Sequence, residues 1–202
     1  MLSRYFSVYL QSKTQYMERF IMQDLIAWKN REDRKPLILL GARQVGKTYI
    51  LKEFGQREFE NVAYINCDNN AMAKDLFASD YNIDRILLTI GAITGVNIEA
   101  GKTLIIMDEI QELHRGLASL KYFCENAREY HVAVAGSLLG LSLHQGESYP
   151  VGKVNTLEMY PMTFEEFLWA RGFKQRMDLL QHGMWDVVKS LRTLYIQHLR
   201  EY

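Results

Sequence analysis

The run "LILLGARQVGKTYILKEF", from Leu37 to Phe54, constrains the fold more than any other part of the sequence. It begins with four apolar residues, continues through a loop that contains Gly41 and Gly46, and ends in a segment with helical spacing. A short continuous apolar run is typical of a strand that is buried on both faces of a parallel sheet. The run therefore predicts a strand, a tight loop and a helix in direct succession.

Further apolar runs predict four more strands, and helical segments separate them. The predicted strands are 37–40, 62–66, 103–107, 132–136 and 156–162, and the predicted helices are 16–28, 47–54, 71–78, 83–93, 115–129 and 163–172. We expect Gly55 to close the helix after the loop, Asn69 to cap the helix at 71–78, and Thr163 with Glu166 to form a capping box. Strands that alternate with helices indicate an α/β fold, a three-layer α/β/α domain with a mainly parallel five-stranded sheet.

The pattern becomes purely helical from about Phe173 onward. We expect an N-terminal extension at 1–15, a core at 16–172 and a helical segment at 173–202. The apolar stripe of the last segment needs a partner surface, which suggests that it begins a further region not included in this chain.

Charge and composition exclude several classes of protein. Lys+Arg and Asp+Glu both count 24 in 202 residues, so no overall basic excess favours a protein that coats nucleic acid. Cys67 and Cys124 form neither a CxxC motif nor a disulfide framework, and the five histidines show no ligand spacing. No apolar run approaches the roughly 20 residues of a membrane-spanning helix. We expect a cytoplasmic protein that does not enter a membrane.

The loop after the first strand matches the Walker A pattern GxxxxGK[ST] without a mismatch. Its glycines allow successive N–H groups to turn inward, and the helix that follows directs its positive dipole end at the same place. Lys47 would reach the β- and γ-phosphates of ATP, and the Thr48 hydroxyl would bind Mg²⁺. The predicted cofactor-binding residues are Gly41, Ala42, Arg43, Gln44, Val45, Gly46, Lys47 and Thr48.

An acidic pair supplies the second half of the predicted site. Asp108 and Glu109 directly follow the apolar residues of the third strand. A carboxylate at this strand end would bind Mg²⁺ beside the loop, which makes Asp108 the second predicted metal ligand with Thr48. Glu109 points in a different direction and is predicted to orient and polarise the attacking water. A strand followed by a solvated acidic turn is the alternative for either residue alone.

Ser137 follows the fourth strand and has two interpretations. It can sense the γ-phosphate or position water, as a catalytic residue together with Glu109 and Lys47. It can equally be the N-cap of the segment "LLGLSL", because serine is a favoured N-cap.

Four segments, in order, resemble one known family. "GARQVGKT", "AGKTLIIMDEIQEL", "VAVAGSLLGLSL" and "YPVGKVNTLEMYPMTFEEFL" are similar to the predicted AAA-type P-loop ATPases of bacteria and archaea that carry a C-terminal domain of unknown function. The likeness covers roughly 16–171. It implies a sheet of order 5-1-4-3-2, with ATP and Mg²⁺ held by the Gly41–Thr48 loop, Asp108, Glu109 and Ser137. It also implies a longer chain, and any contact with nucleic acid would lie in that missing C-terminal region.

The sequence departs from the family pattern at one position, and other positions stay open. Members often have Gly-Arg where this chain has Gly152-Lys153, so Lys153 is either a weaker γ-phosphate sensor or a surface charge. Arg115 and Arg128 are candidates for an arginine finger toward a neighbouring copy in a homo-oligomer, or ordinary solvated charges. Trp28 is a candidate for a contact with the adenine ring.

The combined pattern predicts an enzyme that hydrolyses ATP with Mg²⁺ and couples the reaction to a conformational change. A nucleotide-gated switch or scaffold with little turnover is the main alternative, which the Lys153 departure leaves open. A small-molecule kinase is less favoured, because the acidic pair is typical of hydrolysing proteins and no acceptor-site lid is evident.

Overall fold

The five predicted strands pair into one parallel sheet in the computed structural model, which describes residues 19–68, 70–136 and 150–202. The strands are β1 (Leu37–Leu40), β2 (Asn61–Asn66), β3 (Thr103–Asp108), β4 (His131–Ala135) and β5 (Asn155–Glu158). Their order in the sheet is β2-β3-β4-β1-β5, which confirms the expected order 5-1-4-3-2 read from the opposite edge.

The register of the sheet aligns the carboxyl ends of three strands. Asn66 at the end of β2 pairs with Asp108 at the end of β3, and Asp108 pairs with Ala135 at the end of β4. The polar residues that follow these strands therefore gather at one edge of the sheet, where ligands bind in open parallel sheets.

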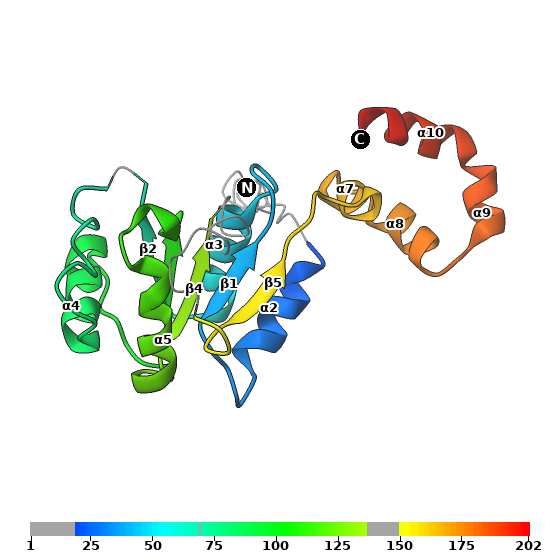
Figure 1. The fold of residues 1–202 in the computed structure, drawn as a ribbon. Coiled ribbons are helices and arrows are strands. Elements are labelled where there is room, and N and C mark those ends of the chain that lie inside the picture. The colour runs from blue at the N-terminus through cyan, green and yellow to red at the C-terminus, as the bar shows by residue number, and fades with distance from the viewer. Residues whose placement is uncertain (1–18, 69, 137–149) are drawn as a thin grey trace, which may run out of the picture. The chain divides into compact units, whose positions relative to one another are not determined.

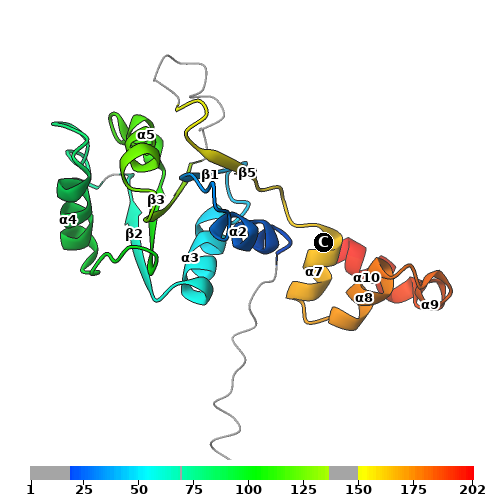
Figure 2. The same ribbon diagram turned by 90° about the horizontal axis from the view of Figure 1, so that it is seen from below.

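Helices cover both faces of the sheet, as Figures 1 and 2 show. Alternate strand residues divide between two hydrophobic clusters. Ile105 and Met107 pack on the face covered by α4 (Ile83–Thr94) and α5 (Gly116–Asn126). Leu104 and Ile106 pack on the face covered by α2 (Ile21–Lys29) and α3 (Lys47–Glu58). This burial on both faces explains why the strands are continuously apolar. A short 3₁₀ turn, η1 (Ile110–Glu112), precedes α5.

Two helix predictions were wrong. Gly55 does not end α3 but lies inside it, where a Cβ atom would come within 2.7 Å of the side chain of Val62, so this glycine permits close helix–strand packing. Residues 71–78 form turns and not a helix. The Asn70 side chain accepts hydrogen bonds from the N–H groups of Met72 and Ala73, while the expected cap, Asn69, lies outside the described residues. Local side-chain bonds of this kind compete with helix formation.

A second compact unit contains Met162–Tyr202 together with Arg19 and Phe20, and the first contains Ile21–Pro161. The capping box of Thr163 and Glu166 is confirmed at the start of α7 (Phe164–Ala170). Because α7 packs with the helices after it, the units divide at 161/162, whereas the sequence suggested 172/173. The helices of this unit are α7 (Phe164–Ala170), α8 (Lys174–Gln181), α9 (Trp185–Ser190) and α10 (Arg192–Glu201).

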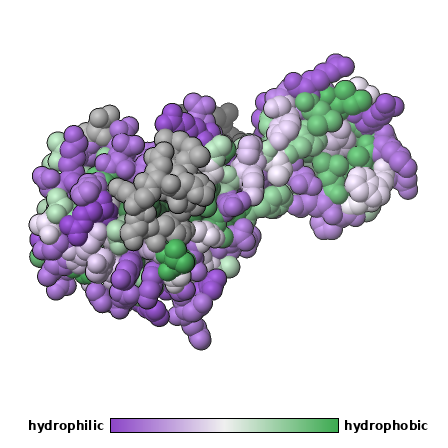
Figure 3. All heavy atoms as spheres, viewed as in Figure 1, coloured by the Kyte–Doolittle hydropathy of each residue, from purple (hydrophilic) through white to green (hydrophobic). Residues whose placement is uncertain are grey.

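The helical unit has a small core of its own, formed by Leu168, Met177 and Tyr195. Hydrophobic residues also reach its surface on the face seen in Figure 3, and Trp185 and Leu199 are more than half exposed. Among the helices of the described residues, none has the length and apolar character that a membrane span requires.

Candidate nucleotide-binding site

The glycine loop joins the carboxyl end of β1 to the first residue of α3. Gly46 has a left-handed backbone (φ 95°) directly before α3, and Gly41 has φ 152°. A Cβ atom at Gly41 would lie 2.3 Å from the carbonyl oxygen of Met159, so no side chain fits there. Gln44 also has a positive φ, 64°, an uncommon conformation for a residue with a side chain. Both loop glycines are therefore required by the backbone.

The start of α3 lies at the end of this loop, and its geometry suits an anion. The first N–H groups of a helix have no partner within the helix, and the helix dipole is positive at this end. Gly46, the N-cap residue, has no side chain to cap these groups. A phosphate group placed over the loop would meet both the N–H groups and the dipole.

Lys47 is buried at the base of the loop. Its ammonium group donates hydrogen bonds to the carbonyl oxygens of Gly41 (2.9 Å) and Ala42 (2.8 Å). Burial lowers the pKa of Lys47, and the negative charges of Glu109 and Asp108 oppose that shift. The lysine is thus held against the loop backbone, within a region that carries two acids.

Thr48 and Asp108 meet although they are 60 positions apart in the sequence. The Thr48 hydroxyl donates to Asp108 Oδ2 over 2.5 Å, and the Asp108 side chain is almost completely buried. A hydroxyl and a carboxylate are hard oxygen ligands, and Mg²⁺ in proteins takes one or two such ligands and keeps several waters. The donor set that these two residues bring together therefore fits Mg²⁺.

A cavity of about 590 Å³ opens beside this pair. Its walls include five of the predicted loop residues and both acids of the predicted pair. The lining residues are Arg43, Gln44, Gly46, Lys47, Thr48, Tyr49, Asp68, Asp108, Glu109, Gln111 and Glu112. Gly41, Ala42 and Val45 belong to the loop but not to this lining. A cavity of this size suits a small-molecule ligand.

Glu109 follows Asp108 and has a left-handed backbone, with φ 53° and ψ 45°. This conformation turns the chain from β3 into η1, and it is strained for a residue with a Cβ atom. The side-chain amide of Gln111 donates a hydrogen bond to Glu109 Oε2 over 2.5 Å. Glu109 is therefore held at the cavity by a neighbour on the same turn.

A family model for an AAA domain matches residues 33–168, about two thirds of the chain. The chain belongs to this AAA domain family. Members are nucleotide-binding P-loop ATPases, which agrees with the loop, the acidic pair and the sheet order of the structure. The match includes every element of the sheet and both halves of the candidate site.

Three solved structures resemble this AAA domain in fold. They are Orc1 of Aeropyrum pernix in complex with DNA (14% identity, 84% of this chain and 52% of that chain, TM-score 0.48), the RuvB Holliday junction branch migration motor of Thermotoga maritima (19%, 83% and 51%, 0.44), and PCH-2 of C. elegans (11%, 81% and 46%, 0.44). The chain spans about half the length of these proteins. No curated protein matches it in sequence.

Tyr64 contacts the site of this AAA domain and was not predicted. Its hydroxyl lies 3.3 Å from Asp108 Oδ2, and the Lys52 ammonium lies 3.4 Å from the centre of its ring. Burial, followed by the charge of Asp108, raises the pKa of Tyr64 to about 12. Burial, followed by the charges of Asp108 and Glu109, raises the pKa of Cys67 also to about 12; the Cys67 N–H group donates to the Asp108 carbonyl oxygen. In the sequence, Tyr64 reads as one more apolar residue of a buried strand.

Four lining residues were also missed. Asp68 follows the end of β2, and the rule that parallel strands present their carboxyl ends at one edge could have identified it. Gln111 and Glu112 lie on η1, and Tyr49 lies on the first turn of α3. No pattern distinguished these three from ordinary surface residues.

The positions of the other candidates differ. Ser137 lies outside the described residues, so its two interpretations stay predictions. Lys153 precedes β5 at the amino ends of the strands, opposite the loop, and pairs with Glu125 at 2.8 Å, which raises the pKa of Lys153. A sensor role for Lys153 toward phosphate in its own chain is therefore wrong. Trp28 is buried against Phe54 and His131, so its predicted adenine contact is also wrong.

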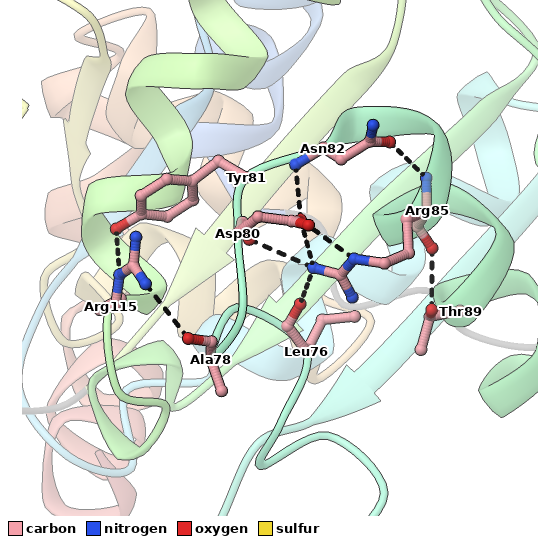
Figure 4. A network of polar contacts seen from close by, with 8 residues as sticks. All are labelled: Leu76, Ala78, Asp80, Tyr81, Asn82, Arg85, Thr89 and Arg115. Carbon is pink, nitrogen blue, oxygen red and sulfur yellow. Dashed lines mark hydrogen bonds and ion pairs between the residues drawn. The ribbon is translucent and has the colours of Figure 1, made fainter.

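Both candidate arginine fingers make contacts within the AAA domain itself. Arg115 donates from Nε to the Tyr81 hydroxyl (3.0 Å) and from Nη1 to the Ala78 carbonyl oxygen (3.2 Å), as Figure 4 shows. Arg128 donates to the Cys124 carbonyl oxygen over 2.7 Å. These contacts favour the interpretation of both residues as structural charges of their own chain.

Proposed function

We propose that this AAA domain binds ATP with Mg²⁺ and hydrolyses it. The observation that carries the proposal is the meeting of Thr48 and Asp108 beside a cavity that Lys47 and Glu109 also line. The site then contains a group that binds phosphate (Lys47), two metal ligands (Thr48 and Asp108) and a base that can activate water (Glu109). A simple nucleotide binder needs the first two but not the third.

Each residue has a separate task in this proposal. Lys47 neutralises charge on the β- and γ-phosphates, and the loop N–H groups hold the phosphate oxygens. Thr48 and Asp108 would hold Mg²⁺, which supplies positive charge to the phosphate oxygens when it is bound. Glu109 orients the attacking water and accepts its proton. The reaction thus depends on positioning and charge and requires no covalent intermediate with the protein.

The contact between Gln111 and Glu109 favours a second candidate function, a nucleotide-gated switch with little turnover. Gln111 donates to Glu109 Oε2 and so occupies one of the lone-pair directions of that oxygen. This contact competes with water for the carboxylate, which would slow turnover without blocking it. Hydrolysis stays the leading proposal, because a switch needs no carboxylate at this position.

Phosphate release and nucleotide binding, measured on the wild type and two variants, test the proposal. Glu109→Gln keeps the shape of the side chain and removes the base, so it should bind ATP normally and release phosphate roughly 100-fold more slowly or worse. Lys47→Ala should lose both binding and turnover. Equal, near-background phosphate release by the wild type and Glu109→Gln, with normal ATP binding in both, would support the switch and reject the hydrolase.

We further infer that hydrolysis drives a conformational change and that copies of the chain form a homo-oligomer. Both features rest on the resemblance to AAA-type ATPases. Sedimentation with and without ATP tests the second point, and a single, nucleotide-independent monomer would contradict it. No contact with nucleic acid is proposed for these residues, and a cytoplasmic location stays a prediction.

A further inference from the structure

Tyr64 bridges two elements that the candidate site uses. It lies on β2, next to β3, and pairs in register with Ile106, two residues before Asp108. Its ring lies under the Lys52 ammonium on α3, and its hydroxyl lies 3.3 Å from Asp108 Oδ2. Thr48 lies one turn before Lys52 on the same face of α3. The tyrosine therefore lies between the helix that carries one predicted metal ligand and the strand that carries the other.

A single oxygen atom of Asp108 receives two hydrogen bonds. Thr48 donates to Oδ2 from α3, and Tyr64 donates to the same oxygen from β2. A carboxylate oxygen offers two lone-pair directions, so both directions on Oδ2 are used. Rotation of the carboxylate would break at least one of these bonds, and the two donors together fix its orientation.

We propose that Tyr64 is a positioning residue for Mg²⁺, which holds the Asp108 carboxylate in the orientation that the metal needs. The inference rests on the proposed function, because it assumes that Asp108 and Thr48 hold the metal of a metal–nucleotide complex. Partners that orient metal ligands affect metal affinity strongly although they do not touch the metal. Tyr64 does not line the cavity, so it acts through Asp108 and not on the nucleotide.

The ring of Tyr64 is itself held in place. A cation over the face of an aromatic ring is attracted by the ring's electrons, and the Lys52 ammonium at 3.4 Å is within that range. The Lys52 contact thus limits the positions that the phenol can take. Loss of the cation should loosen the tyrosine and, through it, Asp108.

Binding of a fluorescent ATP analogue to the full chain tests the proposal without reliance on turnover. Its dissociation constant is measured in EDTA and across a Mg²⁺ titration, for the wild type and Tyr64→Phe. We expect unchanged affinity in EDTA and a rise of roughly tenfold to 100-fold in the Mg²⁺ concentration that gives half of the metal-dependent gain in affinity. The bond at 3.3 Å is long, so the lower end of this range is expected.

Tyr81→Phe is the matched control, because it also removes a tyrosine hydroxyl, one that accepts a hydrogen bond from Arg115 away from the cavity. Its Mg²⁺ midpoint should equal that of the wild type. Lys52→Met should shift the midpoint in the same direction as Tyr64→Phe, but less. Thermal melting of each variant in EDTA shows whether a shift reflects general loss of structure, since a merely structural role lowers the melting temperature without moving the Mg²⁺ midpoint.

The outcomes separate this inference from the proposed function. If Mg²⁺ leaves the wild-type affinity unchanged, the metal assignment of the proposed function fails and the role of Tyr64 fails with it. If the wild type responds normally and Tyr64→Phe has the same midpoint, only the positioning role is overturned. Should Tyr64→Phe melt far below the wild type, Lys52→Met decides, and an unshifted midpoint in that variant rejects the proposal.

Discussion

At the scale of single residues, Gly41 shows how closely the loop is packed. Its backbone conformation and the carbonyl oxygen of Met159 both exclude a side chain. The motif requires glycine here because the loop backbone must approach the phosphates. The structure adds a second reason, a contact with Met159, which follows β5. The loop is thus shaped from two sides.

We predict that Gly41→Ala lowers the free energy of unfolding by roughly 2–4 kcal/mol and weakens ATP binding. Gly101→Ala is the matched control, because Gly101 has φ 76° but nothing within 4 Å of an added Cβ atom. Gly101→Ala should lower the free energy of unfolding only by the cost of a left-handed conformation, roughly 1–2 kcal/mol, and should leave ATP binding intact. Urea unfolding and nucleotide titration measure the two effects. Equal losses of stability in both variants would contradict the clash with Met159.

The site residues that the sequence predicted are those whose type and spacing match a known chemical pattern. Lys47, Thr48 and Asp108 follow buried strands in a recognisable order, and the structure brings them together. Tyr64 was missed because its role depends on which strand lies next to β3, which the sequence does not state. Trp28 was misplaced because helical spacing reveals a buried face but not what packs against it.

At the scale of elements, α7 depends on a buried carboxylate. Glu166 accepts hydrogen bonds from the N–H groups of Thr163 and Phe20, both at 2.8 Å, and pairs with the Arg19 guanidinium at 3.1 Å. Both side chains of the ion pair are buried. Removal of one partner of such a pair leaves an uncompensated charge, which is costly.

We predict that Glu166→Gln destabilises the helical unit by roughly 3–5 kcal/mol, because Arg19 loses its counter-charge. Thr163→Ala removes only the capping oxygen and should cost about 1 kcal/mol. Unfolding of the full chain, followed by fluorescence of Trp169 and Trp185 in the helical unit, measures both. If the two variants lose the same stability, the ion pair contributes nothing beyond the cap.

The strands were predicted to within a few residues, because a buried parallel strand is continuously apolar and needs no distant information. The turns at 71–78, in contrast, were wrongly predicted as a helix. Asn70 supplies local hydrogen bonds, and Arg85 and Arg115 bind the carbonyl oxygens of Leu76 and Ala78. These arginines come from later elements, so the helical pattern of this segment was overridden by partners that the local sequence does not contain.

At the scale of the whole molecule, His131 links stability to pH. It is buried at the start of β4, and its Nε2 lies 2.6 Å from Arg34 Nη1. A guanidinium only donates, so Nε2 accepts and the ring is neutral. Burial, followed by the positive charges of Arg34 and Lys29, lowers the pKa of His131 to about 4.

We predict that stability falls as pH drops from about 6.5 toward 4. The unfolded chain binds a proton near pH 6.5, while the folded chain does not until about pH 4, so the folded state is favoured fully above this window and less within it. The loss should reach about 3 kcal/mol at its largest. His131→Gln keeps an acceptor without titrating, so the difference between the two unfolding curves isolates the histidine. Parallel pH dependence of both proteins would reject this assignment.

The buried Glu166 also bears on where this chain can be cut. The family match runs from 33 to 168, yet Arg19 and the Phe20 N–H group, which bind this carboxylate, lie before it. A fragment expressed with those limits would leave Glu166 with Thr163 as its only partner of the three, and it would end inside α7. It would also lack α2, whose Leu25 is fully buried against the sheet. The segment that matches the family model is therefore shorter than the segment that folds as a unit. A fragment that keeps the contacts of Glu166 should begin no later than Arg19.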